Sequence, residues 1–132
     1  MLYNVTWNSS ETKKIYQATK NSEMLMEYLE ESLVQTGLCK LIGEHPSPNR
    51  GYGVLNYYFT SNPRKRLLSS APRRNHDHIH VVIFNSILKR QLLQELGFDL
   101  GKEKVTVDIK IHKKHEIDKL IEILKINLFR AQ

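Results

Sequence analysis

Three histidines alternate with other residues in one short segment, at His76, His78 and His80. Successive side chains of a β-strand point to opposite faces, so this spacing would place the three imidazoles on one face of a strand. Neutral imidazole is a ligand for divalent ions, and neighbouring positions on one face are near enough for two rings to share an ion. The spacing therefore predicts a metal site held by His78 and His80.

The sequence leaves the third ligand of this site open. It could be His76 itself, or a carboxylate such as Glu44 brought in from another strand. We expect the ion to be Mn²⁺ or Mg²⁺, with Zn²⁺ as the alternative. A different interpretation needs no metal: the histidines would be partly exposed at the start of a strand, and only His80 would pack.

Positive charge is concentrated before the histidine segment. The chain has 20 basic and 14 acidic residues, a formal net charge of +6. Residues 45–74 contain six basic side chains and no acidic one, whereas residues 1–44 contain four and six, and residues 75–132 ten and eight. Arginine forms paired hydrogen bonds with phosphate oxygens, so the stretch predicts a nucleic-acid backbone as partner; a solvated basic loop is the alternative. Its six basic residues are Arg50, Arg64, Lys65, Arg66, Arg73 and Arg74.

The string from Asp77 to Ser86, DHIHVVIFNS, resembles the His-hydrophobic-His motif of the HUH endonuclease superfamily. That superfamily includes rolling-circle replication initiators, parvovirus-type replication proteins, plasmid relaxases and single-strand transposases. The resemblance implies that His78 and His80 lie on a central strand of an antiparallel sheet and hold a divalent ion. The ion would polarise the scissile phosphate of single-stranded DNA, and a tyrosine would attack that phosphate and become covalently attached to it.

The position of that tyrosine is a departure from part of the superfamily. Initiators and transposases place it downstream of the histidines, relaxases upstream, and here every tyrosine lies at or before Tyr58. Tyr16 is the candidate, because Lys20 lies one helical turn beyond it, where a cation could activate the phenol or neutralise the phosphate. The alternative is that Tyr16 only packs. Tyr57 and Tyr58 would point to opposite faces of a strand, so that one packs and the other could stack on a base.

Hydrophobic periodicity predicts an α+β fold in one domain, residues 1–132. We expect an antiparallel sheet of four to five strands covered by about three helices. Strands are expected over residues 2–7, 38–42, 52–60, 76–84 and 104–111. Helices are expected over residues 11–36, from a cap at Asn85 or Ser86 to Gly97, and from Lys113 or Lys114 to Leu128. Within the segment 11–36, Asn21 or Ser22 could cap a second helix, and Gly37 could end it.

Two polar regions are expected outside the core. Residues 62–74 contain two prolines, paired serines and the arginines, so they are expected to form a long connection, and long ordered loops are often functional. Asp108 and Lys110 should lie on the wet face of the last strand. His112 and His115 flank the start of the last helix and are expected in solvent.

Composition excludes several classes of protein. The chain has 132 residues, of which 40% are hydrophobic and 26% charged, as in soluble globular domains. No stretch approaches the roughly 18 apolar residues of a membrane span, and residues 1–14 do not resemble a secretory signal. Because Cys39 is the single cysteine, disulfide scaffolds and paired-cysteine zinc fingers are excluded. We therefore expect a cytoplasmic protein with no membrane partner.

Two functions follow as hypotheses. The first is a small basic DNA-processing enzyme that cleaves and rejoins single-stranded DNA by metal-dependent transesterification. The second is a non-catalytic nucleic-acid-binding or protein-interaction module of a virus, mobile element or defence system, in which the histidines are structural. A covalent protein–DNA adduct would separate the first from the second.

Overall fold

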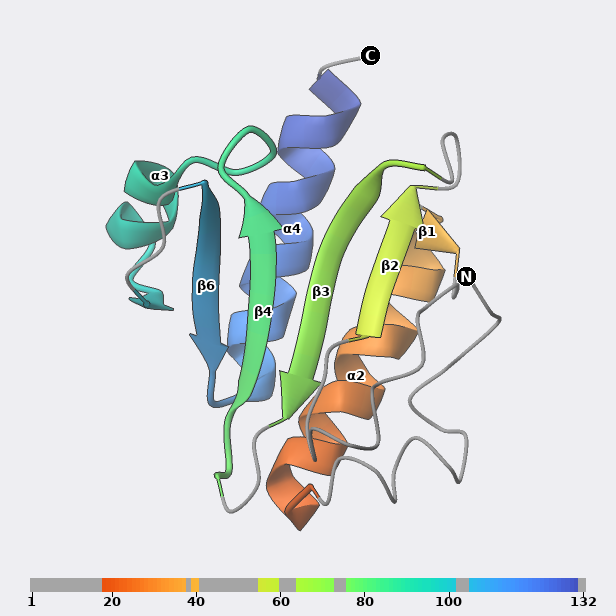
Figure 1. The fold of residues 1–132 in the computed structure, drawn as a ribbon, viewed down its shortest axis with the longest axis vertical. Coiled ribbons are helices and arrows are strands. Elements are labelled where there is room, and N and C mark those ends of the chain that lie inside the picture. The colour runs from red at the N-terminus through yellow and green to blue at the C-terminus, as the bar shows by residue number, and fades with distance from the viewer. Residues whose placement is uncertain are drawn as a thin grey trace.

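The computed structural model describes residues 18–37, 39–40, 55–59, 64–72, 76–101 and 105–130. Within these ranges six strands form one antiparallel sheet in the order β1-β2-β3-β4-β6-β5. The strands are β1 (Cys39–Lys40), β2 (Leu55–Phe59), β3 (Arg66–Pro72), β4 (Ile79–Phe84), β5 (Asp99–Leu100) and β6 (Thr106–Ile111). The helices are α2 (Lys20–Thr36), α3 (Arg90–Glu95) and α4 (Lys114–Arg130), which confirms the α+β class (Figure 1).

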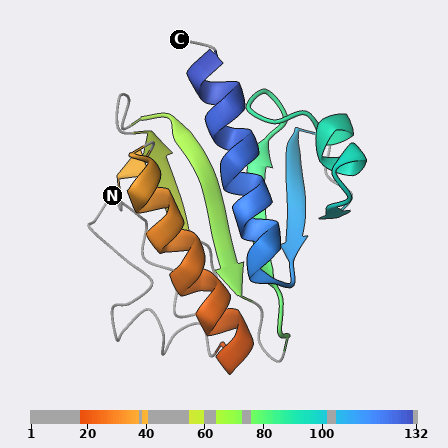
Figure 2. The ribbon, with the colours of Figure 1, turned by 180° about the vertical axis from the view of Figure 1, so that it is seen from behind.

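The described elements form two layers. Helices α2 and α4 lie side by side across one face of the sheet (Figure 2), and α3 lies beyond the β6 side of the sheet. The opposite face, which is turned toward the viewer in Figure 1, carries no helix in the described part of the chain. We call it the open face. Any side chain that alternates away from the core must therefore emerge there.

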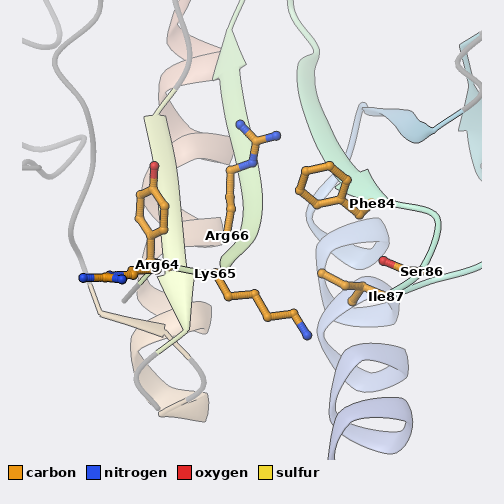
Figure 3. A pocket seen from close by; sticks show the side chains of 7 residues that line it. Arg64, Lys65, Arg66, Phe84, Ser86 and Ile87 are labelled. Carbon is orange, nitrogen blue, oxygen red and sulfur yellow. The ribbon is translucent and has the colours of Figure 1, made fainter. Parts of the chain in front are cut away.

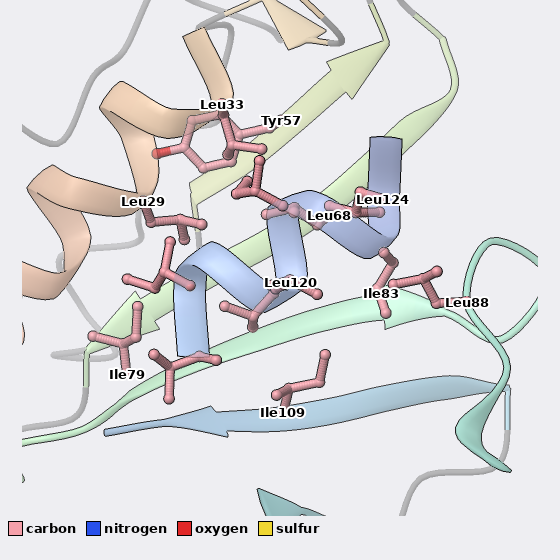
Figure 4. Close-up of a cluster of buried hydrophobic side chains, with 14 of the residues drawn as sticks. Leu29, Leu33, Tyr57, Leu68, Ile79, Ile83, Leu88, Ile109, Leu120 and Leu124 are labelled. Atoms are coloured by element: carbon pink, nitrogen blue, oxygen red, sulfur yellow. The ribbon is translucent and has the colours of Figure 1, made fainter. Parts of the chain in front are cut away.

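The hydrophobic core lies between the sheet and the two long helices (Figure 4). Every second residue of β4 and β6 is buried, the pattern of strands with one covered face. Each long helix contributes an apolar stripe at three- and four-residue spacing. The core residues of these four elements include Leu25, Leu29, Leu33, Ile79, Val81, Ile83, Val107, Ile109, Ile111, Ile117, Leu120 and Leu124.

Helix α2 begins at Lys20, nine residues after the start of the expected segment, and its cap differs from the expectation. The hydroxyl of Thr19 accepts the backbone N–H of Ser22 at 3.2 Å, so Thr19 is the N-cap. Asn21 and Ser22 lie inside the first turn, and the prediction that either is a cap was wrong. Gly37 ends the helix with φ of 69°, as predicted. The expected strand 2–7 and helical residues 11–17 lie outside the described residues.

The largest difference from expectation is in the basic segment 62–74. It was expected to be a connection, but Arg66–Pro72 forms β3, which pairs with β2 on one side and β4 on the other. Leucine, serine and alanine side chains fill this strand, and all but its first residue are buried. Small and apolar residues fit a strand flanked on both sides, and this pairing overrides the turn preference of serine. Proline occurs only at the last position, where the strand ends.

Three further elements differ from the expectation. The histidine strand begins at Ile79, with the segment from His76 to His78 preceding it. Helix α3 is short, because Asn85 accepts the N–H of Arg90 through its side chain at 2.9 Å and the residues between form turns. Strand β5 was not predicted.

None of the helices in the described part of the chain has the length and apolar content that crossing a bilayer requires.

Candidate functional site

The side chains of His78 and His80 meet on the open face. Their Nε2 atoms lie 3.2 Å apart and their ring centroids 5.0 Å apart. Zinc–nitrogen bonds of about 2.0–2.1 Å in tetrahedral geometry place two ligand nitrogens about 3.3 Å from each other. The pair therefore has the separation of two ligands on one ion. The same distance suits a hydrogen bond when one Nε2 carries a proton.

Alternation along β4 places His80 on this face. Ile79, Val81 and Ile83 point into the core, so His80 and the other even-numbered residues point outward. His78 lies just before the strand and its ring stays next to that of His80. The period-two spacing in the sequence thus indicated the shared face of this pair.

Asp108 orients His80 from the neighbouring strand. The Nδ1 of His80 lies 3.0 Å from Oδ1 and 3.2 Å from Oδ2 of Asp108. A carboxylate at Nδ1 holds the proton there and leaves the Nε2 lone pair directed toward His78. Gly101 permits the carboxylate to lie where it does, because a Cβ at this glycine would be 3.0 Å from Oδ2 of Asp108. The sequence had placed Asp108 only on a wet face, so its role was missed.

Two more imidazoles lie beside His78. The ring centroids of His76 and His112 are each 5.2 Å from that of His78. Nε2 of His112 lies 3.0 Å from Oδ2 of Asp99, on the short strand β5. His112 is half exposed, but it does not stand apart in solvent as expected. Its place in the cluster depends on the pairing of β6 with β4, which no local pattern reports.

The cluster favours the neutral form of His78. Its pKa is lowered from the ordinary 6.5, mainly by partial burial and then by the neighbouring positive charges of His80 and His112. The hydrogen bond with His112 lowers the pKa of Asp99. A neutral imidazole offers its lone pair to a metal, so this shift supports ligation at His78.

The donor set constrains the choice of ion. In the part of the chain that the structure describes, no three side chains of His, Cys, Asp or Glu are placed together to hold a metal. The His78–His80 pair would supply two nitrogens, and water or a phosphate oxygen would complete the coordination. Imidazole suits Mn²⁺ and Zn²⁺, whereas Mg²⁺ prefers oxygen ligands, so the pair favours the first two ions. Glu44, the suggested carboxylate ligand, lies outside the described residues.

The start of α2 lies against the segment that leads into the histidines. The Asn21 side chain donates to the carbonyl of Asp77 at 2.6 Å, and the Thr19 hydroxyl donates to that of His76 at 3.4 Å. The exposed Lys20 lies between these two anchor residues in the chain. Its predicted partner Tyr16 lies outside the described residues.

The described tyrosines occupy three different environments. Tyr28 donates from its hydroxyl to Asp118 of α4, on the helical layer. Tyr57 is 1% exposed and belongs to the core. Tyr58 alternates to the open face, as expected for one of the adjacent pair, and it lines the pocket described next.

A basic and aromatic pocket lies at the other end of β4 from the histidines. Its volume is about 470 Å³. Figure 3 shows the Arg66 guanidinium group beside the Phe84 ring, with Ser86 and Ile87 on the same side as Phe84. The lining residues are Tyr58, Arg64, Lys65, Arg66, Phe84, Ser86 and Ile87. Three predicted phosphate-binding residues are thus brought together, whereas Arg50, Arg73 and Arg74 lie outside the described residues.

A β-bulge directs Arg66 into this pocket. Tyr57 pairs with Leu68, but Tyr58 pairs with Arg66, so Leu67 is an extra residue in β3. Both leucines are fully buried. Without the extra residue, alternation would turn Arg66 toward the core and Leu67 toward solvent. The bulge therefore puts a guanidinium group on the open face.

Comparison with known proteins adds no assignment: no family model, curated protein or solved structure matches the chain. Two groups of residues on the open face are therefore the candidates for function. These are the histidine cluster at one end of β4 and the basic pocket at the other.

Proposed function

We propose that this protein processes single-stranded DNA with the help of a divalent ion held by His78 and His80, in the manner of the HUH endonucleases that its histidine segment resembles. The observation that carries the proposal is the 3.2 Å separation of the two Nε2 atoms on the open face, with Asp108 behind His80. A buried or splayed pair could not bring an ion to a DNA phosphate. Both histidines of this pair are partly exposed in the described structure, which supports access for a DNA phosphate.

The distribution of charge on the open face supports a polyanionic substrate. The cations Arg64, Lys65 and Arg66 gather around the pocket beyond Phe84. A strand of DNA along β4 would reach both the ion and these cations. Arginine and lysine at phosphates supply most of the affinity of such complexes.

The proposed reaction is a transesterification. His78 and His80 would hold the ion, which would supply the charge that polarises a phosphodiester; the nucleophilic oxygen forms a bond to phosphorus as the bond to the leaving sugar oxygen breaks. The nucleophile loses its proton to solvent and the leaving oxygen takes one up. Tyr16 is the proposed nucleophile and Lys20, at the start of α2 beside the histidine segment, the proposed cation. The reaction needs no external energy source, and a reducing cytoplasm is its proposed location.

Labelled single-stranded DNA with Mn²⁺ tests the proposal. We expect a covalent protein–DNA adduct on a denaturing gel, lost when a chelator is added and lost in His80→Ala. His115→Ala is the matched control, since His115 is exposed on α4 and absent from the cluster contacts. Failure of the wild-type protein to yield a cleaved or covalent product with Mn²⁺, Mg²⁺ and Zn²⁺ would overturn the enzymatic proposal.

A non-catalytic single-strand-binding module is the second candidate. The aromatic and basic pocket favours it, because stacking and phosphate contacts need no metal. For this function binding should survive a chelator and no product should form with any of the three ions. The same gel therefore separates the two candidates.

A further inference from the structure

We propose that the pocket between β2, β3 and the end of β4 is a nucleotide subsite, in which one base of single-stranded DNA stacks on Arg66 while Arg64 and Lys65 hold the adjoining phosphate. The proposal deepens the proposed function and rests on it for the identity of the ligand. It assigns roles to Phe84 and Asn56 that the histidine site does not require.

The location of the pocket suits a strand that passes the histidines. His80 and Phe84 point to the same face of β4, four residues apart. At about 3.3 Å per residue, this spacing corresponds to about 13 Å. The pocket is thus a separate contact on the same surface, and it would hold a nucleotide that flanks the one at the ion.

The lining of the pocket matches the two parts of a nucleotide. Its lining includes three consecutive cations, and none of the described residues that line it is acidic. Tyr58, Phe84 and Ile87 offer apolar surface to a base, and Ser86 offers a hydroxyl. Its volume of about 470 Å³ lies in the range of pockets that enclose small ligands. Positive charge beside aromatic surface is the combination that single-strand-binding proteins use.

Arg66 is held in place by its surroundings. Its guanidinium group lies 4.9 Å from the centroid of the Phe84 ring, and its Nη1 donates to Oδ1 of Asn56 at 3.3 Å. Asn56 is only 4% exposed and also accepts a hydrogen bond from the Ser69 hydroxyl. A fixed, planar guanidinium group can stack on a base with little further loss of side-chain entropy. Asn56 is therefore a positioning residue, and Phe84 supports one face of the guanidinium group.

Every nucleobase has a π-face, so the subsite should take any base at one fixed place in the bound strand. Stacking also depends on the planar group, whereas phosphate binding depends on charge. Arg66→Lys keeps the positive charge but removes the planar guanidinium group. That variant separates a base subsite from a basic surface that attracts DNA without orienting it.

The test is a fluorescence anisotropy titration of labelled oligothymidylate, about 10 nucleotides long, in the presence of a chelator. A single abasic position is moved along the oligonucleotide. We expect wild-type protein to lose affinity about tenfold at one abasic position. In Arg66→Lys and Phe84→Leu, binding should weaken by a similar factor and the abasic position should no longer matter. Lys125→Gln, a charge change on the helical layer, should bind within twofold of wild type.

For each protein, the affinity for an abasic oligonucleotide is compared with the affinity for the intact one in the same preparation. A misfolded fraction in one variant therefore cannot produce or hide the difference. Equal binding of all abasic oligonucleotides by wild-type protein would overturn the subsite, and so would unchanged binding by Arg66→Lys. Neither result depends on metal, because the titration contains a chelator. The Mn²⁺ assay therefore tests the cleavage proposal independently. An abasic penalty without cleavage would support the subsite and refute the enzyme.

Discussion

Asp108 of β6 and His80 of β4 lie diagonally across two paired strands, with an oxygen of the carboxylate 3.0 Å from Nδ1 of the imidazole. This contact fixes the orientation of a histidine whose side chain is only 15% exposed. It decides which nitrogen carries the proton and so aims the other nitrogen at His78. The histidine pair is a candidate metal site because of this neighbour as well as because of its own spacing.

Asp108→Asn tests the orienting contact. The amide keeps the size of the carboxylate but can donate to Nδ1, which would place the His80 proton on Nε2. We expect affinity for Mn²⁺ or Zn²⁺ to fall about 10- to 100-fold, as for other partners of metal-ligating histidines. Competition with a chromophoric chelator measures it. Asp118→Asn, on the helical layer, is the control, and equal affinity of Asp108→Asn and wild type would contradict the assignment.

The lowered pKa of His78 predicts an acid-sensitive fold. The unfolded chain binds a proton at His78 near its ordinary pKa of 6.5, whereas the folded chain binds it only at lower pH. The contribution of His78 to stability is therefore complete above pH 6.5 and is lost as pH falls through the folded pKa. Urea unfolding across this range should show a shallower pH dependence in His78→Gln than in wild type. A change of equal size in His115→Gln would assign the effect to net charge.

His112→Ala should shift two titrations in the same direction. Removing a positively charged neighbour raises the pKa of His78 toward its ordinary value, and removing the hydrogen-bond donor raises the pKa of Asp99. Proton-detected titration of the side chains by NMR measures both. If both groups titrate as in wild type, His112 does not belong to the cluster in solution.

Gly101→Ala should displace the Asp108 carboxylate that orients His80. The added methyl group would lie 3.0 Å from Oδ2 and 3.2 Å from Cβ of Asp108, so the carboxylate must shift from its position beside His80. We expect a severalfold loss of metal affinity, measured as above. Gly37→Ala is the control, because it should lower stability without touching the site. The positive φ of Gly37, 69°, predicts that alanine lowers the free energy of unfolding in urea by about 1 kcal/mol and leaves the metal affinity unchanged. Wild-type affinity in Gly101→Ala would argue against coupling between Asp108 and the ion.

Salt dependence tests the cations of the pocket. Lys65 faces the pocket and its Nζ lies over the ring of Phe59 at 5.2 Å. If it contacts a phosphate, Lys65→Gln should reduce the slope of log affinity against log salt by about 0.7. Anisotropy titrations at several salt concentrations give the slope. Lys125→Gln should leave it unchanged, and a flat response of the wild type would exclude phosphate as the ligand.

The sequence predicted the elements that have their own periodicity. Alternation from Thr106 to Ile111 and the apolar stripe from Ile117 to Leu124 both appear as expected, because one face of each is covered. The same period-two pattern indicated the shared face of His78 and His80. It missed β3, because the residues from Leu67 to Ala71 form a strand only when β2 and β4 flank them.

What the sequence determined by itself was therefore local: which residues alternate, where Gly37 stops a helix, and that two imidazoles share a face. Only the tertiary structure decided which residues lie next to these two imidazoles. The pairing of β4 with β6 brings Asp108 and His112 to the histidines, and one extra residue in β3 turns Arg66 outward. These relations depend on register between segments distant in the chain, and register is set by the packing of the whole core rather than by any short stretch.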